Sequence, residues 1–155
     1  MQFEVWAKGL ATLSVDCIVL GVFEEGELPE ETHGIDSASN GYLKKLLARG
    51  DFSGRTGETL LLAEVPGIEA SRALLTGLGA KKSFGRKSWR RSLGAAMTAI
   101  SKTRIASIAV AIDRPPAKEL DWKKEEAAHL KNIRQVTRAI ARVRPIRQIV
   151  NHAPQ

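Results

Sequence analysis

Val15-Asp-Cys-Ile-Val-Leu-Gly-Val-Phe23 is an almost unbroken apolar run that is rich in β-branched residues. Strands exposed on one face alternate apolar and polar residues, whereas strands covered on both faces read as continuous apolar runs. The run therefore predicts a strand in the middle of a sheet, with helices packed on both faces. A sheet covered in this way belongs to the α/β fold class.

Outward from this strand, apolar segments and helical patterns alternate along the chain. Further strands are predicted at Phe3–Ala7, Thr59–Ala63, Arg72–Thr76, Ile105–Ile112 and Ile146–Val150. The Pro66-Gly67 turn favours antiparallel pairing of the two strands that it separates. The sequence thus predicts a mixed β-sheet flanked by helices on both faces, in a single domain. The predicted core includes Cys17, Ile18, Val19, Leu61, Leu74, Ile108 and Val110.

Three helices are predicted between the strands. They run from Asp36 or Ser37 to Arg49, from Ser83 to about Thr103, and from Asp121 to Val143. The first residue of each is an N-cap type, and Gly50 and Pro145 follow the first and third helices as stop signals. The acidic stretch Glu24–Gly34 is predicted to be a loop.

The composition bounds the class of protein. The chain has 155 residues, which is the size of one ordinary domain. It has no apolar run of about 18 residues, which predicts no membrane-spanning segment, and no secretory signal pattern at its start. Cys17 is the only cysteine, so the chain forms no internal disulfide and no thiolate cluster. We expect a cytoplasmic protein that does not bind membranes.

Charge is unevenly distributed along the sequence. The net charge is +7, but residues 1–80 carry 6 Lys/Arg against 12 Asp/Glu, and residues 81–155 carry 18 against 5. Such a split indicates either a basic surface that attracts an anionic partner or two halves that fold against each other.

Motifs for catalysis are weak. The histidines His33, His129 and His152 are scattered without metal-ligand spacing, and neither G-x-S-x-G nor a Walker A motif occurs. Gly77-Leu78-Gly79 lacks the third glycine of a dinucleotide loop, since Lys82 stands there, and favours a tight turn. We expect no metal, cofactor or catalytic residue in this chain.

A basic run is the remaining candidate site. Lys81–Arg91 holds six cations in eleven residues, interleaved with Phe84 and Trp89. Cations attract phosphates and aromatic rings stack on bases, so the run is a candidate nucleic-acid contact; alternatively, the aromatic residues anchor a helix and leave the cations solvated. The candidate contacts are Lys81, Lys82, Arg86, Lys87, Arg90 and Arg91, with Arg134, Arg138 and Arg142 along one side of the third predicted helix.

Four segments carry a family resemblance. They are Asp16–Phe23, Gly41–Asp51, Gly54-Arg-Thr-Gly-Glu-Thr-Leu-Leu-Leu62 and Arg72-Ala-Leu-Leu-Thr-Gly-Leu-Gly79. In this order they resemble the N-terminal domain of the leucyl (cytosol) aminopeptidases, well over residues 15–112 and fairly to about 143. Beyond that point the sequence departs from the family, because Arg144-Pro-Ile-Arg147 replaces a Tyr-x-Phe segment and a lysine-rich link.

The resemblance implies a macro-like topology for residues 1–143, with 121–143 as a linker helix and 144–155 as a tail or link. It also implies a full-length enzyme that releases N-terminal amino acids with two zinc or manganese ions, assembles as a homo-hexamer, and in some bacteria binds DNA. The family's metal ligands lie in a separate catalytic C-terminal domain, whose motif Asn-Thr-Asp-Ala-Glu-Gly-Arg-Leu does not occur here.

These observations lead to three hypotheses about the function of the chain. The first is a non-catalytic domain for positioning and assembly, inactive alone and present as a fragment or truncated paralogue. The second is a nucleic-acid-binding module that uses the basic half, residues 81–147. The third is a small-ligand module, because macro-like folds elsewhere bind ADP-ribose.

Overall fold

A computed structural model describes the backbone of residues 2–5, 9–112 and 138–141 and the side chains of residues 9–112. These residues form a six-stranded sheet in the order β1-β6-β5-β2-β4-β3. The strands are β1 (Gln2–Val5), β2 (Cys17–Phe23), β3 (Thr59–Leu62), β4 (Arg72–Gly79), β5 (Ser107–Ala111) and β6 (Arg138–Ala141). The mixed α/β sheet is confirmed.

The predicted central strand is central. β2 lies between β4 and β5, is parallel to both, and every one of its residues is buried. Of the strands that the structure describes, only β3 is antiparallel to its neighbour, with Thr59 opposite Thr76 and Leu62 opposite Ala73. This confirms the antiparallel pairing predicted from the Pro66-Gly67 turn.

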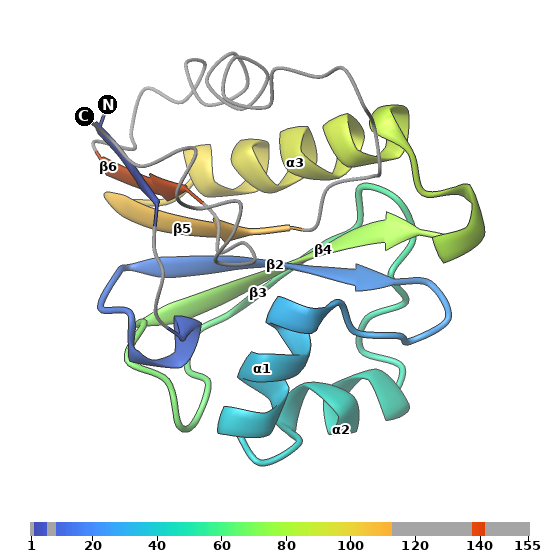
Figure 1. Cartoon of the computed structure of the whole chain (residues 1–155), viewed down its shortest axis with the longest axis horizontal. Coiled ribbons are helices and arrows are strands. Elements are labelled where there is room, and N and C mark those ends of the chain that lie inside the picture. The colour runs from blue at the N-terminus through green and yellow to red at the C-terminus, as the bar shows by residue number, and fades with distance from the viewer. Residues whose placement is uncertain (1, 6–8, 113–137, 142–155) are drawn as a thin grey trace.

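Helices cover both faces of the sheet, as Figure 1 shows. The helices α1 (Glu30–Ala38) and α2 (Tyr42–Ala48) lie on one face, and α3 (Arg86–Ser101) on the other. The short 3-10 helices are η1 (Leu10–Thr12) and η2 (Lys81–Ser83). Alternate residues of β2 enter two cores: Ile18 and Leu20 pack on the α1 side, whereas Cys17 and Val19 pack on the α3 side.

The first predicted helix is wrong in its bounds. The chain is helical from Glu30, inside the predicted loop, and the helix is divided in two by Asn40 and Gly41, which have φ of 56° and 75°. Residues in the left-handed region cannot continue a right-handed helix. Asp36 nevertheless acts as a cap, because its carboxylate accepts a hydrogen bond from the Lys44 N–H in the first turn of α2 (3.0 Å). Gly50 ends α2 with φ of 82°, as predicted.

The start of the second predicted helix is also wrong. Ser83 belongs to η2, and α3 begins two residues beyond Phe84 with Gly85 at its N-cap. Ser88 takes over the capping role, since its Oγ accepts a hydrogen bond from the Gly85 N–H at 2.9 Å. The predicted apolar stripe is buried, as Leu93, Met97 and Ile100 pack on the sheet.

Two further predictions fail. Leu61 is predicted in the core but is 41% exposed, because β3 is the last strand in the order of the described sheet and has a neighbour on one side only. Arg138–Ala141, expected within the third helix, forms β6 and fills the sheet between β1 and β5. The rest of that helix and the strand at Ile146–Val150 lie outside the described residues.

Candidate functional site at the carboxyl edge of the sheet

Ligands of open α/β sheets bind outside the carboxyl ends of the parallel strands, where connections leave to opposite faces. Here the chain leaves β2 toward α1 on one face and leaves β4 toward α3 on the other. Three loops with described side chains meet at this edge. They are residues 24–29 after β2, residues 52–58 before β3, and residues 80–85 after β4.

The glycines of Gly77-Leu78-Gly79 fit a neighbouring loop rather than a phosphate. Gly77 N–H donates to the Glu58 carbonyl oxygen (2.8 Å), and Gly79 N–H donates to that of Gly54 (2.9 Å). A Cβ at Gly77 would collide with the backbone of Gly54 and Arg55, and Gly79 has φ of 79°. The motif therefore serves close backbone packing, in line with the structural interpretation of the sequence.

Glu58 holds the loop before β3 in shape. Its carboxylate accepts hydrogen bonds from the Ser53 N–H (3.2 Å), the Ser53 hydroxyl and the Arg55 N–H (3.2 Å). Desolvation by burial acts to raise the pKa of Glu58, but these hydrogen bonds outweigh it and the pKa is lowered. Glu58 is therefore an ionised structural clamp and not a general acid.

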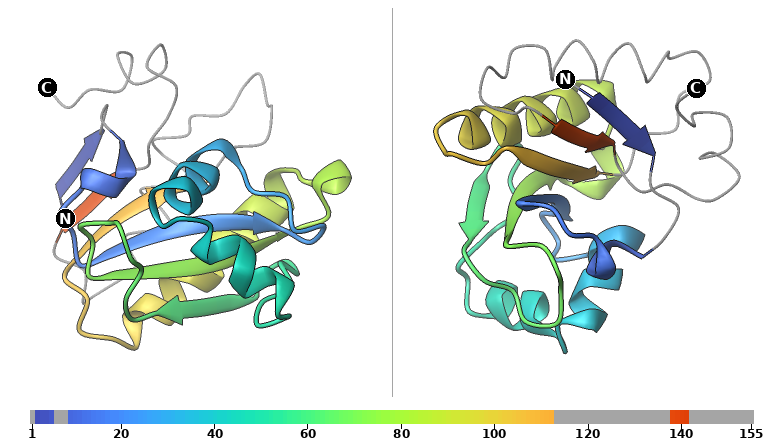
Figure 2. Two further views of the ribbon diagram at one scale, coloured as in Figure 1. Left: turned by 90° about the horizontal axis from the view of Figure 1, so that it is seen from below. Right: turned by 90° about the vertical axis from the view of Figure 1, so that its left-hand side faces the viewer.

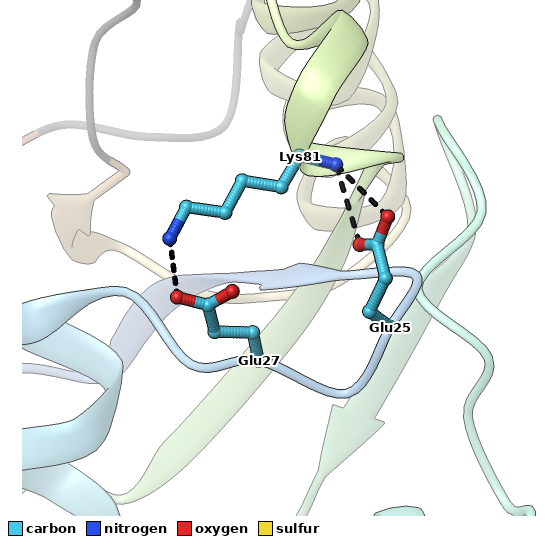
Figure 3. A network of polar contacts seen from close by, with 3 residues as sticks. All are labelled: Glu25, Glu27 and Lys81. Carbon is cyan, nitrogen blue, oxygen red and sulfur yellow. Dashed lines mark hydrogen bonds and ion pairs between the residues drawn. The ribbon is translucent and has the colours of Figure 1, made fainter.

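The first and second halves of the chain meet in a clasp of Glu25, Glu27 and Lys81 (Figure 3). The Lys81 N–H donates to the Glu25 carboxylate at 3.2 and 3.3 Å, and the Lys81 ammonium pairs with the Glu27 carboxylate. The Lys81 N–H, which faces this edge, is thus already bonded to a carboxylate. Two glutamates at this place oppose the approach of an anionic ligand such as a diphosphate.

Aromatic rings lie beneath the clasp. Phe23 and Phe84 make an edge-to-face contact with ring centroids 5.3 Å apart and an interplanar angle of 83°. Lys81 Nζ lies 6.0 Å from the Phe23 centroid, within the range of a cation–π contact. The ends of β2 and β4 are covered by the chain's own side chains.

Buried hydroxyls fix α3 to β4. The Thr76 hydroxyl donates to the Ser92 carbonyl oxygen at 2.9 Å, and Ser92 Oγ lies 2.6 Å from the Gly77 carbonyl oxygen. Both side chains are fully buried, so these bonds satisfy groups that would otherwise be costly to desolvate. They set the position of the basic first turns of α3.

The six cations of Lys81–Arg91 are all exposed, but their aromatic neighbours are not available for stacking. Trp89 is 2% exposed in the core under α3, and Phe84 packs against the same core. The anchoring role considered for these aromatic residues is therefore confirmed. Arg138 lies on β6, while Arg134 and Arg142 fall outside the described residues, so no helical row of these arginines is described.

Arg55 is a basic residue of this region that the sequence pattern did not select. It is exposed in the loop that precedes β3, and the side chain of the nearby Arg91 lies close to Gly57 of the same loop. The Gly57 N–H bond to the Gly77 carbonyl oxygen (3.1 Å) holds this loop beside the end of β4. The loop that carries Arg55 reaches the basic run through this pairing with β4, which the local sequence does not predict.

Groups able to do chemistry are sparse in the described part of the chain. Burial raises the pKa of the Cys17 thiol to about 12, so Cys17 is inert packing, as predicted. Within residues 9–112, no three His, Cys, Asp or Glu side chains gather in a way that could hold a metal ion. His33 is exposed on α1, and His129 and His152 lie outside the described residues. No helix among the described residues is long and apolar enough to cross a membrane.

The family model described as "Cytosol aminopeptidase family, N-terminal domain" matches residues 19–141. A "Probable cytosol aminopeptidase" of Methylobacillus flagellatus is 38% identical over 125 residues, covering 79% of this chain and 25% of that protein. A protein of the same name from Paraburkholderia phymatum is 39% identical over 132 residues, covering 79% of this chain and 26% of that protein. The chain thus spans about a quarter of the length of these relatives.

Solved structures share the fold. A mutant of tomato leucine aminopeptidase superposes with a TM-score of 0.67 at 20% identity, covering 97% of this chain and 35% of that one. A Trypanosoma brucei macrodomain reaches a TM-score of 0.75 at 13% identity, covering 97% and 65%. The Thermus aquaticus DarG macrodomain reaches 0.70 at 15% identity, covering 93% and 99%. The predicted macro-like topology is confirmed.

Proposed function

The chain belongs to the cytosol aminopeptidase family, as its N-terminal domain, and from this premise we propose that it serves a leucyl aminopeptidase by positioning and assembly rather than by bond cleavage. The match over residues 19–141 carries this proposal. The named relatives are about four times longer than the matched segment, which leaves room in them for a separate catalytic domain.

The carboxyl edge supports the non-catalytic part of the proposal. The edge where open α/β sheets bind ligands is occupied here by the clasp and by Phe23 and Phe84. Its glycines are used for backbone packing, and its best-bonded carboxylate, Glu58, is a structural clamp. The roles of these residues are therefore structural, which supports a non-catalytic domain.

In this proposal the two zinc or manganese ions belong to the catalytic C-terminal domain of the whole enzyme, a cytoplasmic homo-hexamer. The described residues do not fit a metal pair, because they bring no three ligand-type side chains together. No step of peptide hydrolysis is therefore assigned to this chain's own residues.

Activity of the isolated chain is the first test. The 155-residue chain is incubated with leucine p-nitroanilide and Mn²⁺ or Zn²⁺, beside the full-length Methylobacillus flagellatus relative as a positive control. We expect no release of nitroaniline above the blank from the chain alone. Metal-dependent turnover by the purified chain would refute the non-catalytic role.

A domain exchange tests positioning and assembly. Residues 9–141 replace the corresponding segment of the Methylobacillus flagellatus relative, and a second protein lacks that segment altogether. We expect the exchanged protein to keep the relative's mass in light scattering and most of its turnover, and the deleted protein to lose its assembly. Equal assembly of the deleted protein would contradict the proposed role.

Exposure of all six cations of Lys81–Arg91 favours nucleic-acid binding as a second candidate function. Arg55 adds an exposed cation in the loop whose Gly57 lies close to the Arg91 side chain. If the surface binds duplex DNA, the logarithm of the affinity should fall with the logarithm of salt concentration, with a slope of about −0.9 per phosphate neutralised. Lys87→Glu with Arg91→Glu should weaken binding, while Lys44→Glu with Lys45→Glu on α2 should not. Unchanged affinity in the first pair would remove this candidate.

A further inference from the structure

Among the described residues, no strand pairs with the outer edge of β3. β3 is the last strand in the sheet order, and Figure 2 shows it at the rim, paired with β4 on one side only. Leu61, near the middle of β3, is the one large hydrophobic residue within 9–112 that is exposed, with an exposed fraction of 41%. A free strand edge with an exposed apolar residue is a template for pairing with another extended chain.

The register shows which backbone groups point outward. Gly77 N–H donates to the Glu58 carbonyl oxygen, so positions 58 and 77 form a bonded pair. Bonded and non-bonded pairs alternate in an antiparallel ladder, which makes Leu60–Leu75 and Leu62–Ala73 bonded as well. The N–H and C=O groups of Thr59 and Leu61 therefore point away from β4, and no partner for them is found in the described part of the chain.

A hollow lies beyond the end of β3, between β3 and the start of β4. It has a volume of about 490 Å³ and lies in the connection to β4, where Val65, Ile68 and Ala70 supply apolar walls. Glu64 and Arg72 contribute charged groups to the same hollow.

Charge distinguishes between two possible occupants. In antiparallel pairing of two copies centred on Leu61, Glu58 of one copy would lie opposite Glu64 of the other, at both ends of the paired segment. Like charges directly opposite each other destabilise a strand pair. Glu58 is ionised in the folded chain because hydrogen bonds lower its pKa. A peptide with basic residues at both ends and apolar residues between them is complementary to this edge, because its basic residues would lie opposite Glu58 and Glu64.

We propose that β3 binds an extended peptide by strand addition, with main-chain hydrogen bonds to Thr59 and Leu61 and with basic peptide residues opposite Glu58 and Glu64. In strand addition the backbone bonds supply affinity and the side chains on alternate positions supply specificity. The identification of this peptide as substrate of the whole enzyme rests on the proposed function.

The test uses the whole 155-residue chain and a fluorescent peptide with blocked ends, Lys-Thr-Val-Leu-Val-Thr-Lys. Its central leucine lies opposite Leu61, and its two lysines lie opposite Glu64 and Glu58. We expect saturable anisotropy changes, and slower amide hydrogen exchange at Thr59 and Leu61. Methylation of the central peptide nitrogen should weaken binding about tenfold, because it removes a donor to the Leu61 carbonyl oxygen. Replacing both peptide lysines by glutamate should abolish binding.

Protein variants complete the test. Leu61→Ser should weaken binding several-fold, whereas His33→Ser, an exposed change on α1, should leave it unchanged. Equal affinity of the methylated and unmethylated peptides, or exchange protection elsewhere in the chain, would overturn the proposal. A mass that doubles with concentration in the absence of peptide would assign the edge to a second copy and also overturn it. Since the blocked peptide is not hydrolysed, failure here leaves the role in the aminopeptidase standing, and failure of the domain exchange leaves strand addition standing.

Discussion

Leu74 and Leu61 are directly opposed in the β3–β4 ladder, yet they lie in very different surroundings. Leu74 is 1% exposed and packs in the core under α3, whereas Leu61 is 41% exposed. Substituting alanine at each position therefore measures how burial affects the free energy of unfolding, because the removed atoms are the same and the two residues are cross-strand neighbours.

Leu74→Ala should lower the free energy of unfolding by about 2–5 kcal/mol, because it removes buried methyl groups and leaves a cavity under α3. For a chain of this size, that corresponds to a fall in Tm of about 4–20 °C. Leu61→Ala removes a half-exposed side chain at a site that water can fill, so its cost should be about 1 kcal/mol or less.

Urea unfolding followed by circular dichroism measures both variants against the wild type. We expect unchanged m-values and a clearly lower midpoint for Leu74→Ala only. Equal losses in the two variants, or a larger loss for Leu61→Ala, would refute the assignment of β3 as an edge strand and of Leu74 as core.

Three further results are expected. Glu58→Gln should destabilise the folded chain at neutral pH. Since folding lowers the pKa of Glu58, the ionised carboxylate stabilises the fold above the unfolded-state pKa, and this stabilisation is lost as pH falls through the folded-state pKa. The urea midpoints of the variant and the wild type should therefore converge in acid. With a thiol pKa raised to about 12, native Cys17 should react with Ellman's reagent at pH 8 only at the rate of unfolding, and immediate labelling of one thiol per chain would contradict its burial. Gly77→Ala should cost about 1–3 kcal/mol because its Cβ meets the backbone of residues 54 and 55, whereas Gly34→Ala on α1, where a Cβ has open space, should be neutral or stabilising in thermal unfolding.

The sequence predicts the sheet well where one interaction dominates. The apolar run before Phe23 is a strand because burial on both faces outweighs every local preference, and the turn at Pro66-Gly67 pairs its neighbours as expected. Helix ends are less accurate, because several capping residues compete locally. At α3, Ser88 caps through Gly85 instead of Ser83, and at α2 the cap comes from Asp36 across a break.

The candidate site is predicted only in part. The sequence identifies the cations of Lys81–Arg91, but it leaves open whether Trp89 stacks on bases or anchors the helix, and only the structure shows that Trp89 is buried. The clasp joins residues 56 positions apart, and Arg55 reaches its place through the pairing of its loop with β4. Contacts of this kind depend on the register of distant strands, which no local pattern encodes. The exposure of Leu61 was missed for the same reason, since the sequence does not tell which strand lies at the edge.

The contact of Glu25 and Glu27 with Lys81 changes the electrostatic potential that the domain produces far from its surface. Along the sequence the negative and positive halves are well separated, but at this rim their charges touch. Opposite charges closer together than the Debye length, about 8–10 Å in physiological salt, cancel in the far field. The clasp holds two carboxylates and one ammonium, so it keeps one net negative charge after this cancellation. A passing polyanion should therefore be weakly repelled at the clasp and attracted to the exposed cations in the first turns of α3.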